Sequence, residues 1–291
     1  MPKDTEYADL LENLTLQHQQ RLSDSLERLE SEVVKLVSKA PLKDGNLYDL
    51  EWAIAQRKKI RSAMEAEYLT EVQDILKGYQ GVANNTYKML GAYGSFNELS
   101  PKVIQQLQRL SFQGFEAIGN EYLDVISTEV YQSTLTNRAF NDSIKSIQQT
   151  INGVYIQSND AEAKRLVNIA KNGTAQQSAA AVEKLHALYA RDRVGNNLRR
   201  YSSTYAQDSL MQFDASINTA IGKESGATQW KYYGGTTAGT RSFCRKHDGK
   251  TYTNEEIEQI WAGSWAGKSS SDAFIARGGY NCQHHWRPVF N

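Results

Sequence analysis

The sequence has few cysteines and no long apolar run, and these absences exclude several classes of protein. Only two of its 291 residues are cysteines, which excludes a disulfide framework. This usage predicts a protein made and kept in a reducing, cytosol-like compartment. The N-terminus lacks the apolar segment of a secretory signal, and no apolar run approaches the length of a membrane span. We therefore expect no membrane partner.

The chain also lacks an excess of charge of either sign. Lys and Arg together number 33, and so do Asp and Glu. A protein that coats nucleic acid or binds a membrane surface is usually basic, so this balance argues against both classes. It favours protein contacts over extended phosphate binding.

Proline is scarce, with four residues in the whole chain, so long stretches are free to be helical. Between Thr5 and Ala40, one set of residues recurs at steps of mostly three and four, which predicts an amphipathic helix or coiled coil. The set is Leu11, Leu14, His18, Leu22, Leu26, Leu29, Val33 and Val37. Ala40-Pro41 is expected to end this helix.

Further helices are predicted along most of the next 180 residues. A second long helix is expected over 47–80, followed by a stretch that Gly78, Gly81, Gly91 and Gly94 interrupt. Ser100-Pro101 is a favourable helix start, with serine as N-cap and proline in the first turn. The remaining helices are expected over 113–135, 139–152, 160–192 and 195–221.

The composition changes near Gly222, where glycine, threonine and tryptophan become more frequent. Strands are predicted over 229–235, 249–253 and 285–290, a short helix over 254–263 with Asn254 as N-cap, and an irregular loop over 267–280. The predicted fold class is therefore mainly α. Long amphipathic helices form an extended helical body, 1–221, and a small mixed α+β module, 222–291, follows it.

Two short segments of this module hold both cysteines and three of the five histidines. They are the pairs Cys244-x2-His247 and Cys282-x-His284, with His285 as an alternative to His284. Two such pairs, one from each of two turns, commonly hold a zinc ion, because its four tetrahedral positions suit thiolate and imidazole. The candidate metal ligands are thus Cys244, His247, Cys282 and His284.

Three interpretations of this cluster stand side by side. It is a structural zinc site, or a remnant of one without metal. The cysteines are instead small buried apolar residues, with histidines bonded to the backbone. Or the cluster is catalytic, as an activated thiolate or a metal-dependent nuclease. Spacing alone does not decide among them.

The order of residues in the tail resembles the C-terminal module of phage minor head proteins, the Mu F-like head morphogenesis family. The resemblance lies between 240 and 289, and the preceding residues share only helical character. The matching residues are Thr240, Arg241, Phe243, Cys244, His247, Gly249, Lys250, Tyr252, Thr253, Glu256, Ile257, Gly278, Gly279, Tyr280, Asn281, Cys282, His284, Arg287, Pro288 and Val289. His284 stands where many members carry a second cysteine, and no acid precedes Thr240-Arg241 by a few residues.

The resemblance implies a non-enzymatic virion protein, assembled in the host cytoplasm and associated with the portal vertex. Its expected partners are the portal protein and other capsid components, with packaged DNA as a further contact. It would assist capsid assembly, retain DNA or act in ejection. In the module, we expect Arg241, Lys250 and Asn281 to be structural, with Arg241 and Lys250 in internal polar contacts.

Two alternatives to this function remain open. The tail is a metal-dependent nuclease or thiol hydrolase that uses the Cys/His cluster. Or the chain is an oligomeric, ring-forming head–tail adaptor or ejection protein, whose ring helices come from 5–80.

Overall fold

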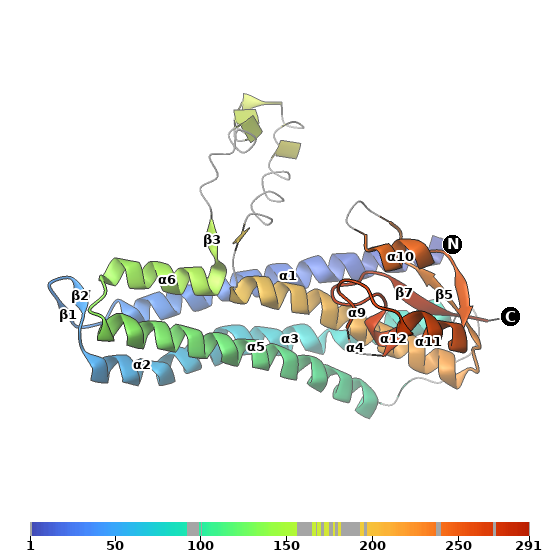
Figure 1. The fold of residues 1–291 in the computed structure, drawn as a ribbon, viewed down its shortest axis with the longest axis horizontal. Coiled ribbons are helices and arrows are strands. Elements are labelled where there is room, and N and C mark those ends of the chain that lie inside the picture. Colours follow the sequence, from blue (N-terminus) through green and yellow to red (C-terminus); the bar gives the residue numbers. More distant parts are fainter. Residues whose placement is uncertain are drawn as a thin grey trace. The chain divides into compact units, whose positions relative to one another are not determined.

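The computed structural model confirms a mainly α-helical chain that ends in a small region of strands and short helices (Figure 1). It describes residues 2–91, 99, 101–155, 165–166, 168–169, 172–174, 177, 180–181, 193–194, 197–236, 240–269 and 272–290. The chain divides into two compact units. Unit 1 comprises Met1–Ser23, Leu69–Ala117 and Ser202–Asn291, and unit 2 comprises Asp24–Tyr68 and Ile118–Tyr201.

The elements follow one another in a simple order. The helices are α1 (Pro2–Val37), α2 (Leu50–Ala63), the π-helix η1 (Met64–Leu69), α3 (Thr70–Lys77), α4 (Tyr79–Leu90), α5 (Pro101–Leu135), α6 (Phe140–Asn152), α9 (Leu198–Glu224), α10 (Ser242–His247), α11 (Asn254–Ala262) and α12 (Ala273–Ala276). The strands are β1 (Leu42–Lys43), β2 (Asn46–Leu47), β3 (Val154–Tyr155), β4 (Arg193–Val194), β5 (Gln229–Tyr233), β6 (Thr251–Thr253) and β7 (His285–Val289). No described helix combines the length and the hydropathy of a membrane span.

The predicted stripe of α1 is buried, as expected for an amphipathic helix. In unit 1, Leu11 and Leu22 are at most 1% exposed. In unit 2, the stripe residues from Leu26 to Val37 are fully buried. Buried polar contacts add to this packing in unit 1, where Tyr79 Oη lies 2.8 Å from Ser209 Oγ.

Two predicted breaks are only partly correct. Gly78 separates α3 from α4 and Gly91 caps the end of α4, but Gly78 keeps right-handed helical angles and Gly81 lies within α4. Val82, Ala83 and Leu90 are buried on α4, and their burial outweighs the helix penalty of glycine, about 1 kcal/mol per residue. α5 is likewise one helix from Pro101 onward, rather than a separate helix that begins at 113.

Unit 2 contains a hairpin that was not predicted. β1 and β2 pair antiparallel around Asp44 and Gly45, which both have positive φ, 52° and 77°. These angles suit the tight turns that Asp-Gly favours in hairpins. α2 then begins with Asp49, whose side chain accepts a hydrogen bond from Trp52 N at 2.9 Å. Most of the helix predicted over 160–192 lies outside the described residues.

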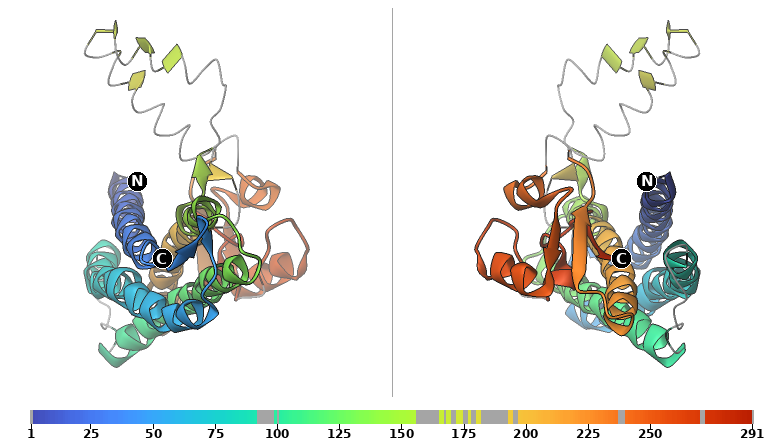
Figure 2. Two further views of the ribbon diagram at one scale, coloured as in Figure 1. Left: turned by 90° about the vertical axis from the view of Figure 1, so that its left-hand side faces the viewer. Right: turned by 90° about the vertical axis from the view of Figure 1, so that its right-hand side faces the viewer.

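The three predicted C-terminal strands form one antiparallel sheet in the order β6-β5-β7. Figure 2 shows this C-terminal region in orange and red. Trp230 is paired with Pro288, and Tyr232 with Trp286. Because side chains alternate between the faces of a strand, Trp230, Tyr232 and Trp286 share the face that forms the module's core.

Three details of this region differ from the prediction. The loop expected over 267–280 contains α12, and the short helix α10 was not foreseen. The N-cap of α11 is Thr253 and not Asn254. Thr253 and Glu256 form a reciprocal capping box, which satisfies two backbone donors at the helix start.

Candidate metal centre

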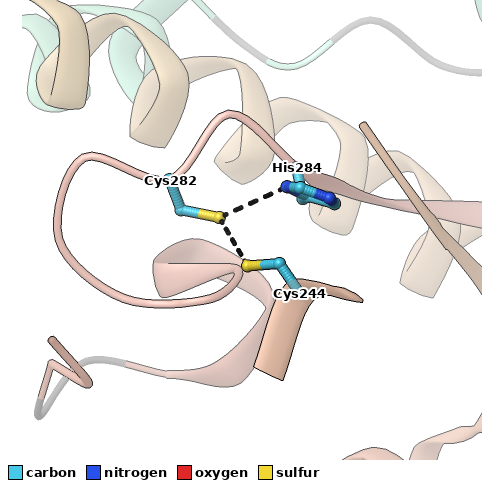
Figure 3. Close-up of side chains that lie close together, drawn as sticks. All are labelled: Cys244, Cys282 and His284. Atoms are coloured by element: carbon cyan, nitrogen blue, oxygen red, sulfur yellow. Dashed lines mark hydrogen bonds between the residues drawn. The ribbon is translucent and has the colours of Figure 1, made fainter. Parts of the chain in front are cut away.

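Cys244, Cys282 and His284 form a buried group that can hold a metal ion. Cys244 comes from α10, and the other two come from the loop before β7 (Figure 3). The two Sγ atoms are 3.7 Å apart, and Cys282 Sγ is 3.9 Å from His284 Nδ1. One ligand atom from each of the three residues lies within 4.8 Å of the others.

These distances fit a tetrahedral ion. With Zn–S bonds of about 2.3 Å and Zn–N bonds of about 2.0 Å, the edges of a tetrahedron are about 3.8 Å between sulfurs and about 3.5 Å from sulfur to nitrogen. The observed sulfur pair matches the first edge. The sulfur–nitrogen distance is a few tenths of an ångström longer, which a small rotation of the imidazole corrects.

The loop that carries Cys282 has an unusual backbone. Arg277, Gly279 and Asn281 all have positive φ, 62°, 109° and 55°. Gly279 also packs against the backbone of Gly267, since a β-carbon there would meet Gly267 O at 2.0 Å. A side chain is excluded at Gly279 for both reasons, so glycine is required for this turn.

A buried arginine fixes the same loop. Arg277 is fully buried, and its Nε and Nη2 donate to the carbonyl oxygen of Cys282 at 3.2 and 3.0 Å. Nη2 also lies 3.0 Å from Asp208 Oδ1 on α9, which accepts from Asn281 N as well. The Cys282 backbone is thereby held by a paired charge, which favours one position for its sulfur.

Tyr232 lies against the group from β5. Its ring stacks on that of His284, with centroids 5.1 Å apart, and its Oη is 3.3 Å from Cys244 Sγ and 3.7 Å from Cys282 Sγ. Burial, followed by the two cysteines, raises the pKa of Tyr232 far above its ordinary value. The phenol therefore remains protonated and can donate a hydrogen bond to a thiolate.

The two cysteines ionise differently. The hydrogen bond with Cys244, together with His284 and Arg277, lowers the pKa of Cys282, although burial opposes this shift. The same hydrogen bond and burial raise the pKa of Cys244. Both shifts arise first from the contact between the two sulfurs, and the thiolate is the form of cysteine that binds metal.

His284 also has an outer partner. Its Nδ1 faces Cys282 Sγ, and its Nε2 is buried 3.8 Å from Asp248 Oδ1, with no hydrogen bond to any described residue. Metal-binding histidines usually direct their second nitrogen to a carboxylate or carbonyl. Asp248 is in turn positioned by Gly234 N, which donates to its Oδ1 at 3.1 Å.

The structure does not bring His247 and His285 into this group. His247 Nδ1 lies 2.8 Å from Tyr252 Oη, and its ring packs on Phe243. His285 Nδ1 lies 3.1 Å from Asp214 Oδ2 on α9. Burial would raise the pKa of Asp214, but contacts with His285 and other neighbours keep it below its ordinary value.

The three residues expected to be structural have different surroundings. Arg241 Nη2 donates to the carbonyl oxygen of Tyr280, and this contact joins the start of α10 to the loop that carries Cys282. Lys250 takes part through its backbone, since its carbonyl oxygen accepts from Tyr232 N at 2.9 Å, and its side chain is exposed. Asn281 donates its backbone N–H to Asp208.

Sequence reasoning did not identify Arg277, Asp208, Tyr232 or Asp248 as parts of the site. Asp248 directly follows His247, and Arg277 directly precedes the Gly-Gly pair, so both had a local signal. Tyr232 lies in the predicted strand 229–235, and its alternation with Trp230 gives no sign of the sulfurs. Asp208 is far away in the sequence and carries no signal.

Comparisons with protein-family models, curated proteins and solved structures find no match. The fold and the site define a mainly α-helical chain with a C-terminal sheet and a buried group of two cysteines and one histidine.

Proposed function

We propose that this chain is a non-enzymatic phage minor head protein of the Mu F-like head morphogenesis type, associated with the portal vertex of the virion. The observation that supports the proposal is the convergence of the tail motif on one centre. Cys244, Gly278, Cys282 and His284 all belong to the motif, and a β-carbon at Gly278 would lie 2.6 Å from Cys244 Sγ. The motif order thus corresponds to a physical site.

We further propose that the centre holds a structural zinc ion. Two sulfurs and one imidazole nitrogen are a borderline-soft donor set, which zinc prefers over calcium or magnesium. When bound, zinc would link α10 to the loop before β7 and stabilise the folded module. Cys244, Cys282 and His284 supply three of its ligands, and Tyr232 Oη lies beside both sulfurs on the side of the β5 strand.

Elemental analysis tests the metal directly. Protein purified without a histidine tag is expected to contain about one zinc per chain, and Cys282→Ser is expected to lose it. Because His247 lies outside the group, His247→Ala serves as the matched control and is expected to retain zinc. An absence of metal from the wild-type protein would refute the zinc site and leave the assembly role standing.

The assembly role rests on the rest of the chain. Long helices without a described cofactor site suit contacts with the portal and other capsid proteins, and the zero net charge does not favour a nucleic-acid coat. The protein is expected to co-migrate with its cognate portal protein and to occur in purified virions. A portal from an unrelated phage is the control. Failure of both tests would refute the role.

One observation favours a second function, a metal-dependent hydrolase or nuclease. The group offers three protein ligands, which is the number in a catalytic zinc site, where water or substrate takes the fourth position. The burial of the group argues against an enzyme, because Cys244 and Cys282 are each only 2% exposed and a substrate would have to reach them. Cleavage of DNA or an ester by the wild type, lost in Cys244→Ala and His284→Ala, would establish the enzyme instead.

A further inference from the structure

Cys244 and Cys282 are both free thiols, and their sulfur atoms face one another across 3.7 Å (Figure 3). We propose that they are an oxidative modification site, at which a small peroxide closes a reversible disulfide within the chain. The inference rests on the placement of the two sulfurs. It requires neither a bound metal nor the role at the portal.

The geometry is close to that of a disulfide. Bonded sulfurs are about 2.05 Å apart, so the pair must approach by roughly 1.7 Å. The two side chains already point toward each other from separate segments (Figure 3). Cys282 lies in a loop rather than in a regular element. Adjustment of the two side-chain torsions and a small shift of this loop would bring the sulfurs together.

The chemistry balances with one peroxide per chain. One cysteine sulfur attacks a peroxide oxygen, the O–O bond breaks, and a sulfenic acid and one water form. The second sulfur then attacks the sulfenic sulfur, the S–O bond breaks, and a second water leaves. Two thiols are oxidised to one disulfide, and hydrogen peroxide is reduced to two waters.

Burial selects the oxidant and the product. Each cysteine is only 2% exposed, so a molecule as small as hydrogen peroxide reaches the sulfurs more readily than a bulky disulfide such as oxidised glutathione. The neighbouring thiol captures the sulfenic acid before a further peroxide arrives. It thereby prevents oxidation to the irreversible sulfinic acid.

The same sulfurs are proposed ligands of zinc, so the two states exclude one another. A thiolate bound to a metal is a poorer nucleophile than a free one, and metal-loaded protein is expected to resist peroxide. Zinc content and disulfide formation are measured separately, so failure of one proposal is distinguishable from failure of the other.

The test uses the full chain, treated with a chelator and then with hydrogen peroxide at neutral pH. Intact mass is expected to fall by two hydrogen atoms per chain, and dithiothreitol is expected to reverse the change. Peptide mapping is expected to find Cys244 and Cys282 in one cross-linked pair. Cys244→Ser should instead gain oxygen atoms at Cys282, because no second thiol is present to resolve the sulfenic acid.

Three results would overturn the proposal. They are the absence of reaction in the metal-free wild type, addition of oxygen to the cysteines without loss of hydrogen, and cross-links between chains instead of within one. All three are read from the wild-type protein, so the test does not depend on the folding of the serine variant.

Discussion

Gly278→Ala tests whether the sulfur group is as closely packed as the structure indicates. Gly278 is buried and does not have a positive φ, so the backbone accepts alanine without strain. The substitution therefore adds one methyl group to the centre and changes little else. Its effect reports the space between Cys244, Cys282 and Tyr232.

The structure leaves no room for a methyl group between these three side chains. The new β-carbon would lie 2.6 Å from Cys244 Sγ, 2.7 Å from Tyr232 Oη and 2.9 Å from Cys282 Sγ. Ordinary contacts of this kind are about 3.5–4.0 Å, so each neighbour must retreat by roughly 1 Å. Insertion of a methyl group into a packed core typically costs about 1–3 kcal/mol. We expect Gly278→Ala to lower the free energy of unfolding by an amount in this range.

Urea unfolding monitored by tryptophan fluorescence measures the change, because Trp230 and Trp286 lie in the same core. Gly81→Ala on α4 is the matched control: it is exposed and its β-carbon would meet nothing within 4 Å. The control is expected to gain up to about 1 kcal/mol from helix propensity. If Gly278→Ala were as stable as the wild type, the packing argued for the sulfur group would be refuted.

Three further predictions concern single side chains. Burial, followed by the charge of Arg21, lowers the pKa of His18 to about 4 in the folded state. The pKa of histidine in the unfolded chain is about 6.5, so between pH 6.5 and pH 4 only the unfolded state takes up the proton. The free energy of unfolding should fall by about 3 kcal/mol as the pH falls through this window, and His18→Gln should remove most of that slope in urea titrations at each pH. Arg277→Met leaves buried acceptors without their donor and should cost about 3–5 kcal/mol in urea unfolding, whereas Lys246→Met, at an exposed position, should stay within about 0.5 kcal/mol. Tyr232→Phe removes the hydroxyl beside the sulfurs and should cost about 1 kcal/mol in the same assay, and no change would contradict the hydrogen bonds inferred here.

Much of the helical fold could be predicted, because helix periodicity is a local property of the sequence. The stripe from Leu11 to Val37 indicated the buried face of α1, and Pro101 indicated the start of α5. α4 was missed because its glycines were given more weight than its apolar residues. The hairpin before α2 was missed although Asp44-Gly45 is a strong turn signal.

The candidate site was predictable in part for a similar reason. Two short segments held the thiols and imidazoles, and the structure brings Cys244, Cys282 and His284 together. Spacing did not show which imidazole belongs to the group. Adjacent side chains of an extended segment point to opposite faces, so one of His284 and His285 faces the sulfurs and the other faces α9. The choice required the register of β7 against β5.

His247 shows the limit of a spacing argument on a helix. The spacing Cys244-x2-His247 predicted two ligands that converge on one ion from a turn, and residues three apart on the observed helix α10 also share a face. On α10, the imidazole turns instead to the hydroxyl of Tyr252. Tyr252 belongs to β6, which begins shortly after α10 and pairs with β5. Sequence spacing on one short helix contains no information about this contact.

The interpretations of the cysteines as metal ligands and as packing residues are compatible. Cys244 and Cys282 belong to a buried core that also includes Trp230, Tyr232 and Trp286. A small zinc finger has no such core and is unfolded without its metal. Here the aromatic residues already bury a large apolar surface, so a metal would add stability to a packed sheet rather than create it. Loss of metal would then loosen the loop before β7 while the sheet persists. The effect of metal removal on the module is therefore expected in that loop.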